Sequence, residues 1–297
     1  MTTAVLEAML VVALWSSSPL LVKIALQELS PLSIAGVRYF ASFLFLAPFI
    51  AYRYRQGRAF VAIGSWWKLA VMGILAFPVG NALLFTGLRT LSATTSAFIL
   101  NAVPIVTLIL GAVLLRERPT LLQWLGLGIS LAGGALFFGE VPGVMDVRAT
   151  LISLAGASAL AAYGVMARDV ARSGEADTVS LAAFPSLFGG GLLLAFAFPS
   201  QAPSSRILAV LAWLAVVNSA VAYVLWTHAM KRLKAFEISV IGNLLPVGTA
   251  IISPFFHGEP ASVRAWLGMA VGLVGVVLVA WRSERFQAPK GATGDIA

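Results

Sequence analysis

The sequence has no cysteine, only two histidines and few charged residues, with 20 Lys and Arg and 12 Asp and Glu among 297 positions. Charged residues make up 11% of the chain, well below the roughly 25% that is usual in soluble domains. The absence of cysteine excludes disulfide bonds, a thiol nucleophile and cysteine-ligated zinc or iron–sulfur sites. The shortage of charge excludes a soluble enzyme built around a water-filled cleft.

Motifs for enzyme chemistry are missing as well. There is no HExxH zinc motif and no GxxxxGK[ST] loop to bind a nucleotide, and the two histidines, His228 and His257, lie in different regions. Acidic residues avoid the middle of the apolar stretches, and Glu7 lies near the end of the first one. We therefore expect no cofactor and no enzyme activity, with a membrane-embedded enzyme as the less favoured alternative.

Apolar residues, by contrast, make up 60% of the chain. They form ten stretches of about 20 residues, the length that a helix needs to cross a bilayer. The predicted fold class is an all-α polytopic membrane protein with ten transmembrane helices, at roughly 5–26, 33–51, 69–89, 92–115, 121–138, 149–168, 179–198, 207–229, 236–256 and 263–281. The hydrophilic tail at 283–297 is too short to fold alone.

Lys and Arg residues are concentrated in alternate loops between these stretches. Because positive loops are retained in the cytoplasm, this bias predicts a multi-pass protein of the cell membrane with both termini cytoplasmic. The loops also account for the net charge of +8, so nucleic-acid binding gains no support. The expected partners are the lipid bilayer and a small-molecule substrate, and the expected functional unit is a monomer.

The chain contains an internal repeat. A shift of 142 residues superposes many identical residues, among them Asn101 on Asn243, Pro104 on Pro246 and Trp124 on Trp266. Each half then holds five stretches, an odd number, so the second half enters the membrane from the opposite side. We predict two inverted five-helix repeats, 1–140 and 149–282, followed by a cytoplasmic tail at 283–297. Inverted repeats are typical of secondary transporters, and a channel is disfavoured because no ring of charges or carbonyl filter is visible.

Small residues recur at helical spacing in the last stretch of each half. Gly126, Ser130 and Gly134 are spaced by four, as are Gly268 and Gly272. This spacing predicts smooth helix faces for close packing rather than a substrate site.

The segment LLRERPTLLQWLG at 114–126, followed by AGG at 132–134, resembles the repeat signature of EamA-type members of the drug/metabolite transporter superfamily. Gly258-Glu259 leading to Trp266-Leu-Gly268 resembles it in the second half, and Trp15 with Lys23 also fits the pattern. Within that superfamily the chain is most similar to the YddG-type aromatic amino acid exporters. The resemblance implies transport of small organic solutes and, at finer level, export of aromatic and other neutral amino acids and related metabolites.

An asparagine and a proline mark the centre of the fourth stretch and again of the ninth. Pro104 and Pro246 each remove a backbone hydrogen bond and free a carbonyl, while Asn101 and Asn243 place an amide at the same depth. A static kink with mutually satisfied polar groups is the plainer interpretation. Because the pattern recurs at one offset, we predict gating hinges at the two prolines and substrate-binding amides at the two asparagines.

Aromatic and polar residues at midspan predict a substrate chamber, formed by Trp15, Ser16, Asn81, Phe85, Tyr163 and Tyr223 together with the two asparagines. Trp15 lies deeper than the interfacial belt where tryptophan usually sits. Aromatic rings can hold an apolar side chain by burial and edge contacts. For the serines near Trp15, packing between helices is an equally good interpretation, and Trp226 and His228 fit an interfacial position equally well.

Lys23 and Arg38 are basic residues placed well within apolar stretches. Charge inside a membrane is costly and usually functional, so both are candidate contacts for a substrate carboxylate, with snorkelling to the surface as the alternative. Basic and aromatic candidates together favour a neutral amino acid as substrate, and a proton-coupled exporter of cationic compounds is the runner-up. Because no carboxylate lies at midspan, we expect uncoupled transport, with proton binding by Glu7 or His228 as the alternative.

Overall fold

The computed structural model describes residues 2–57, 61–103, 105–106, 120–138, 146–233, 241–258 and 261–281. Within these ranges the regular structure is helical, apart from an isolated bridge between Val61 and Ala176. Six of the described helical segments are long and apolar enough to cross a membrane, namely Thr3–Ala25, Pro31–Arg55, Ile63–Gly87, Val147–Ala171, Thr178–Ala197 and Ser205–Arg232. The prediction of an all-α polytopic membrane protein is confirmed at this level.

Capping residues set the starts of several helices. α2 (Pro31–Arg55) follows Ser30, whose hydroxyl accepts a hydrogen bond from the backbone N–H of Ser33. α8 (Val147–Ser173) and α9 (Thr178–Ala197) each follow an aspartate that caps the first turn in the same way. The other α-helices without a π-helical turn are α1 (Thr2–Ala25), α5 (Ala93–Ile99), α7 (Leu121–Phe138), α13 (Leu245–His257) and α14 (Val263–Trp281).

Two of the membrane-crossing segments contain a π-helical turn in their middle. The first consists of η1 (Ile63–Ser65), α3 (Trp66–Ile74), the π-helix η2 (Leu75–Asn81) and α4 (Ala82–Gly87), and the second of α10 (Ser205–Ala215), the π-helix η3 (Val216–Val221) and α11 (Ala222–Arg232). Adding the 142-residue offset to η2 gives 217–223, which overlaps η3. π-Helical turns are rare and concentrate at functional sites. The hydropathy pattern predicts both helices but neither turn.

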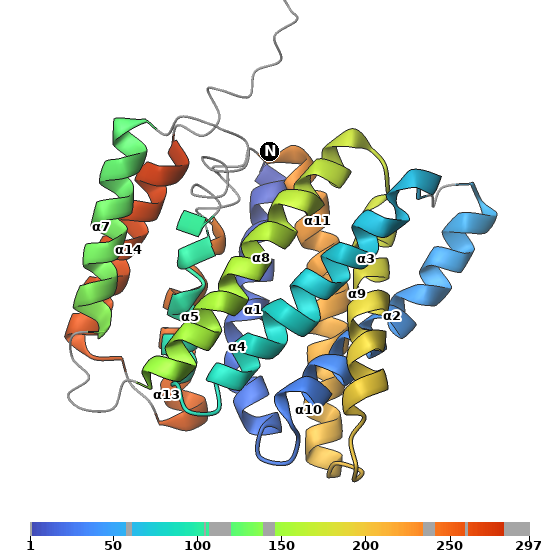
Figure 1. Ribbon diagram of the computed structural model, residues 1–297, viewed down its shortest axis with the longest axis horizontal. Coiled ribbons are helices and arrows are strands. Elements are labelled where there is room, and N and C mark those ends of the chain that lie inside the picture. Colours follow the sequence, from blue (N-terminus) through green and yellow to red (C-terminus); the bar gives the residue numbers. More distant parts are fainter. Residues whose placement is uncertain are drawn as a thin grey trace, which may run out of the picture.

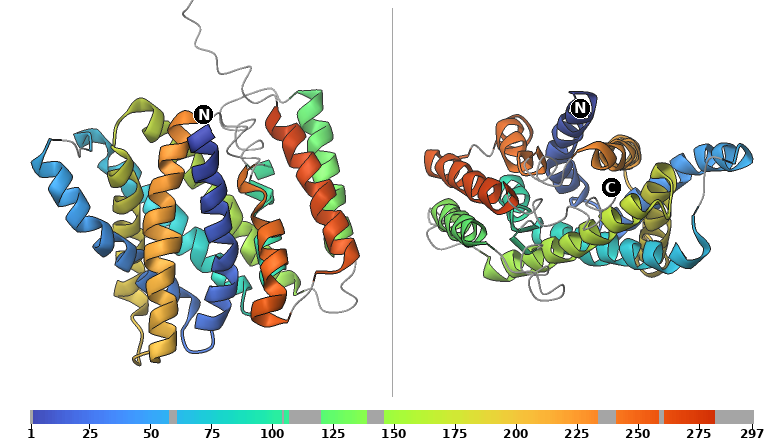
Figure 2. Two further views of the ribbon diagram at one scale, coloured as in Figure 1. Left: turned by 180° about the vertical axis from the view of Figure 1, so that it is seen from behind. Right: turned by 90° about the horizontal axis from the view of Figure 1, so that it is seen from above.

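Figure 1 shows α7 and α14 side by side at one edge of the molecule, with α2, α3 and α9 toward the other. Between these edges α1 packs against α11 and α13, which flank it when the molecule is seen from behind (Figure 2). α2 packs along α9, and α8 packs against α4 and η2. Helix α1 from the start of the chain therefore lies between two helices from its second half.

α7 and α14 approach each other closely in a reciprocal pattern. A Cβ atom on Gly133 would collide with the backbone nitrogen of Gly272, and one on Gly275 would collide with the backbone nitrogen of Ser130. The Ser130 hydroxyl donates to the Gly272 carbonyl at 3.4 Å, and these two residues are 142 positions apart. Each contact thus has a counterpart on the other helix. The predicted face is corrected in one respect, because Gly134 has open space around it and Gly133 makes the contact.

Connections at opposite ends of the molecule use similar chemistry. Where α1 leads into α2, at the lower end of Figure 1, the Glu28 carboxylate accepts hydrogen bonds from the Ser204 backbone N–H at 2.7 Å and the Ser204 hydroxyl at 2.6 Å. Where α8 leads into α9, at the upper end, Glu175 accepts a hydrogen bond from the Ser65 hydroxyl and pairs with Lys68 Nζ at 2.8 Å. These interactions hold the pKa of both carboxyl groups below the usual value.

The predicted stretches overlap helices wherever the structure describes them, but turns at 100–101 and 243–244 interrupt the fourth and ninth stretches, and some boundaries differ. α2 and α8 continue to Arg55 and Ser173, several residues beyond the apolar run, because a helix need not end where the membrane does. α13 begins at Leu245, so Pro246 lies in its first turn rather than in the middle of a continuous helix. Pro104 and the tail at 283–297 lie outside the described residues.

Candidate functional site

Aromatic rings from α1, α2, η2 and α11 form a connected group in which Tyr223 contacts the rings of Trp15, Tyr39 and Phe77. The centroid of the Trp15 ring lies 5.5 Å from that of Tyr223, edge to face, and 5.0 Å from that of Trp226. Tyr223 in turn contacts Phe77 at 6.1 Å and Tyr39 at 6.5 Å, both in T-shaped geometry. Ring pairs of this kind contribute about 0.5–1.5 kcal/mol each. We call Trp15, Tyr39, Phe77, Tyr223 and Trp226 the aromatic cluster.

A buried amide in η3 fastens this cluster to α1. Asn218 is fully buried, and its Nδ2 donates to the Leu14 carbonyl at 2.7 Å and to the Ser17 hydroxyl at 3.0 Å. The backbone carbonyl of Asn218 accepts the indole N–H of Trp15 at 2.9 Å. The Oδ1 atom of Asn218 has no hydrogen-bond partner, which is unusual for a buried acceptor. The π-helical turn therefore orients Trp15 and keeps one acceptor unused.

Hydroxyl and amide groups border the rings. The Tyr223 hydroxyl accepts hydrogen bonds from Tyr39 and from the Asn81 amide, and Asn81 Nδ2 also donates to the Ala76 carbonyl at 2.7 Å. Tyr163 packs against the same core. The structure thus brings together four residues that the sequence predicted for a common chamber: Asn81, Phe85, Tyr163 and Tyr223.

Arg38 of α2 lies beside the aromatic cluster and is 3% exposed. Its Nε donates to the Ser219 hydroxyl at 2.8 Å, and its terminal nitrogens donate to the Ser18 hydroxyl at 2.7 Å and the Asn218 carbonyl at 3.3 Å. Its Cζ lies 5.9 Å from the ring centroid of Phe85. Snorkelling to the surface does not describe this side chain, because its contacts are inside the bundle. Lys23 is half-buried in the last turn of α1.

Ser16 takes part in helix packing. Its hydroxyl donates to the Val12 carbonyl at 2.8 Å, and its own carbonyl accepts the Thr249 hydroxyl of α13 at 3.0 Å. The Ser16 side chain also fills the space that a Cβ on Gly248 would need. These contacts match the packing interpretation of the serines and place Ser16 between α1 and α13.

Asn101 and Asn243 flank helix ends at corresponding places. Asn101 follows α5 and Asn243 precedes α13, and each is 6% exposed. The Oδ1 of Asn101 is buried without a hydrogen-bond partner. Their neighbours Leu100 and Leu244 pack in the same group of side chains as Trp15 and Trp226. The two amides are therefore near the aromatic cluster, and their binding of substrate stays a prediction.

Glu7 and His228 form a hydrogen-bonded pair that joins α1 to α11. Glu7 Oε2 lies 2.8 Å from His228 Nδ1, and the side chains are 19% and 38% exposed. His228 is two positions from Trp226, whose ring contacts Trp15. The sequence named both residues as alternative proton carriers, and the structure brings them into one pair. Trp226 itself packs within the bundle, which favours the chamber over the interfacial interpretation.

Sequence reasoning missed Asn218, Ser219, Tyr39 and Phe77. Asn101 and Asn243 are singled out by the recurrence of an asparagine three residues before a proline, and Asn218 does not share this pattern. The signal that could have found Asn218 is an amide within an apolar run. For Tyr39 and Phe77 no comparable signal exists, because large rings are common throughout the apolar stretches.

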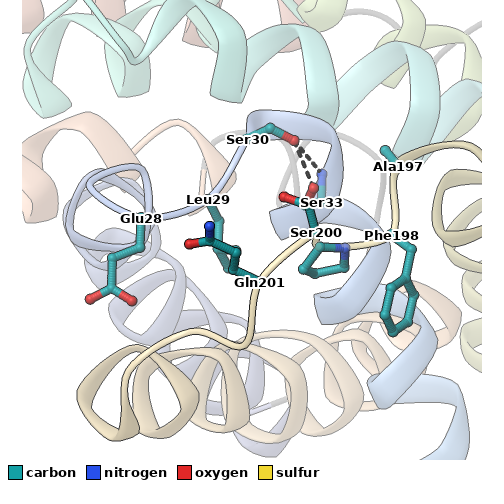
Figure 3. A pocket seen from close by; sticks show the side chains of 9 residues that line it. Glu28, Leu29, Ser30, Ser33, Ala197, Phe198, Ser200 and Gln201 are labelled. Carbon is teal, nitrogen blue, oxygen red and sulfur yellow. Dashed lines mark hydrogen bonds between the residues drawn. The ribbon is translucent and has the colours of Figure 1, made fainter.

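An open pocket of about 300 Å³ lies at the end of the molecule where α1 leads into α2, and it is lined by Glu28, Leu29, Ser30, Ser33, Ala197, Phe198, Pro199, Ser200 and Gln201 (Figure 3). The hydroxyls of Ser30 and Ser33 bond to each other, and Glu28 is engaged by Ser204. Three of the polar side chains around the pocket, those of Glu28, Ser30 and Ser33, are thus engaged in contacts at helix ends. We do not assign a binding role to this pocket.

Comparison with known proteins identifies the family to which the chain belongs. The model of the EamA-like transporter family matches residues 2–139 and again 147–281. The uncharacterized transporter YyaM of Bacillus subtilis is 28% identical over 72% of this chain and 72% of its own length. The uncharacterized inner membrane transporter YedA of Escherichia coli is 24% identical over 90% of this chain and 87% of its own length. A crystal structure matches with a TM-score of 0.68 at 18% identity, covering 97% of this chain and 100% of that one, which shows a shared fold. The chain is a membrane protein that belongs to the EamA-like transporter family.

Proposed function

We propose that this chain is a secondary transporter that exports amino acids, aromatic and other neutral ones and related metabolites, by alternating access and without ion coupling. The observation that carries the proposal is the aromatic cluster, where Trp15 meets Tyr223 and Trp226 deep within the helices. Such rings give an apolar or aromatic side chain a surface to bind. Asn81, Asn101 and Asn243 add amides nearby that can bond to the polar end of an amino acid.

The proposed architecture is ten transmembrane helices in two inverted repeats, 1–140 and 149–282, with both termini in the cytoplasm of a bacterial cell. Three observations support it. The family model matches twice along the chain, the close contacts of α7 and α14 are reciprocal at the 142-residue offset, and the two π-helices fall at corresponding positions. Reciprocal contacts are what a two-fold axis between the halves requires. We take the monomer in the inner membrane as the functional unit.

We also propose that the segments around Pro104 and Pro246 bend as the pathway opens to alternate sides. Support comes from the helix start at Leu245, which places Pro246 in the first turn after a break at Asn243 and Leu244. Pro246→Ala restores a backbone donor and is expected to give a folded protein with slower transport. Spin-label distances across the two openings of the pathway measure the balance between its inward-open and outward-open states. If Pro246→Ala showed wild-type distances and wild-type transport rates, the prolines would be static kinks and not hinges.

Uptake of radiolabelled phenylalanine into proteoliposomes tests the function. We expect uptake that is inhibited by unlabelled phenylalanine and tryptophan and not by cationic dyes. Empty liposomes provide the control. Inhibition by dyes alone would contradict amino acid transport and favour the second candidate, proton-coupled export of cationic compounds. The Glu7–His228 pair is the observation that favours this second candidate, because it places a carboxylate and an imidazole in contact between α1 and α11.

A further inference from the structure

Arg38 carries a positive charge that its neighbours in the structure do not offset. A guanidinium stays protonated in proteins, and the three acceptors around this one are two hydroxyls and a backbone carbonyl, all neutral. Among the described residues no carboxylate lies within ion-pair distance of Arg38, and acidic groups such as Glu7, Glu28 and Glu175 are engaged elsewhere. A buried cation with only neutral partners is costly, and ionisable groups inside a membrane usually mark a transport pathway.

The surroundings of Arg38 connect it to the aromatic cluster. A terminal nitrogen of Arg38 and the indole nitrogen of Trp15 donate to the same carbonyl oxygen, that of Asn218, at 3.3 and 2.9 Å. Arg38 and the Trp15 side chain are therefore joined through one oxygen atom. The Cζ of Arg38 also lies 5.0 Å from the ring centroid of Tyr39. A ligand whose ring contacts Trp15 would have its other end in the neighbourhood of the guanidinium.

The three hydrogen bonds of Arg38 do not use all of its N–H groups. Each terminal nitrogen carries two N–H groups, and each makes one hydrogen bond in the structure. Two further N–H groups therefore remain, which is the number that a bidentate carboxylate contact requires. The present acceptors belong to α1 and η3, so they can exchange with a ligand when these elements move apart during transport.

We infer that Arg38 binds the carboxylate of the transported solute, so that the pathway selects compounds with a free carboxylate and discriminates against amines that lack one. This inference rests on the proposed function and narrows its substrate class. It gives Arg38 a role distinct from that of the aromatic cluster. The rings contact the side chain of the solute, and the guanidinium recognises its carboxylate.

The test compares four related compounds on reconstituted protein. Labelled phenylalanine is taken up in the presence of 3-phenylpropionate, which lacks the amine, or of phenylalaninamide or phenethylamine, which lack the carboxylate. For the wild type we expect 3-phenylpropionate to compete about 10- to 100-fold better than phenethylamine, the size of effect given by one charge-assisted contact. We call this preference for 3-phenylpropionate over phenethylamine the competition ratio. In Arg38→Gln the competition ratio should fall below about threefold. Arg38→Lys should retain an intermediate ratio, because lysine keeps the charge and loses the paired N–H donors of the guanidinium.

Arg55→Gln provides the matched control, because it removes the same charge from an exposed position at the end of the same helix. Its competition ratio should equal that of the wild type. If Arg38 were only structural, Arg38→Gln would weaken all four compounds in proportion and leave the ratio unchanged, and that result would overturn the inference. Equal competition by the four compounds in the wild type would overturn it as well, even if no Arg38 variant folds.

The same panel separates this inference from the proposed function. Binding of each compound to purified protein is followed by tryptophan fluorescence. If phenylalanine neither binds nor is transported while 3-phenylpropionate binds in an Arg38-dependent way, amino acid export fails and carboxylate recognition stands. If phenylalanine is transported and the ratio does not depend on Arg38, the function stands and the inference fails. If no carboxylate binds, both fail.

Discussion

Trp15 makes two kinds of contact that substitutions can separate. Its ring touches Tyr223 and Trp226, and its N–H donates to the carbonyl of Asn218. Ring contacts provide apolar surface, whereas the hydrogen bond fixes the direction in which the ring faces. At the residue scale, the candidate site therefore depends on both the size of this side chain and its anchoring to η3.

Trp15→Ala is expected to lower phenylalanine transport by about tenfold or more, because it removes the ring that contacts both Tyr223 and Trp226. Trp15→Phe keeps a ring but loses one hydrogen bond, worth about 1 kcal/mol, and should cost about fivefold. Tyr163→Ala and Asn101→Ala should also impair transport without preventing membrane insertion. Initial rates in proteoliposomes measure the effects. Trp124→Phe is the control, because Trp124 is 53% exposed and its replacement should leave transport unchanged. Wild-type rates in the Trp15, Tyr163 and Asn101 variants would contradict the chamber.

Glu7 and His228 decide between uncoupled and proton-coupled transport. We expect an amino acid gradient alone to drive transport, and the direction to reverse with the gradient, in wild type and in Glu7→Gln and His228→Ala alike. Each substitution breaks the 2.8 Å pair, so lower protein stability without altered energetics is expected. Accumulation against a gradient under an imposed pH difference, lost in either variant, would instead identify the pair as a proton carrier.

α7 and α14 are the elements whose contact is most restricted by side-chain size. At their crossing Gly133 and Gly275 face backbone atoms of the opposite helix, so no Cβ can be accommodated without displacement. Close approach of this kind stabilises helix association in membranes through packing rather than through the hydrophobic effect. At the element scale, the pair behaves as a single unit at the edge of the molecule (Figure 1).

Adjacent glycines in α7 provide a test with an internal control. Gly133→Ala forces α7 and α14 apart and should destabilise the protein by about 1–3 kcal/mol. Gly134→Ala meets open space and should be neutral or stabilising by up to about 1 kcal/mol, since alanine favours a helix. Thermal unfolding of the purified variants in detergent measures both. Equal melting temperatures for the two variants would show that the helix contact does not depend on Gly133.

At the scale of the whole molecule, composition and hydropathy predict the helices well and the contacts between them poorly. Helices are predictable because a chain in lipid must satisfy its backbone polar groups within each segment. Contacts such as those of Arg38 with Ser219 and of Glu7 with His228 join residues 181 and 221 positions apart. Spacing rules act over one or two helical turns, so they cannot pair such residues, although they can identify each as unusual for its depth.

The absence of cysteine makes the orientation of the whole chain testable with single introduced thiols. Gln201 is exposed in the α9–α10 connection, and Gln56 is exposed directly after α2. The α9–α10 connection and the end of α2 lie toward opposite ends of the molecule (Figure 1). We expect a membrane-impermeant maleimide to label Gln201→Cys in intact spheroplasts and Gln56→Cys only after lysis. The unmodified protein is the control and should show no labelling. The reverse pattern would place both termini outside the cytoplasm.

The π-helical turns bear on the ancestry of the chain. A π turn holds one residue more than an α turn, so it records an insertion that the helix has absorbed without breaking. If the halves descend from one duplicated gene, η2 and η3 at overlapping offset positions are explained by one insertion in the single-repeat ancestor, whereas separate origins would need the same event twice. Since one residue turns an α-helix by about 100°, an insertion at η3 would also set which face of α11 points toward Trp15.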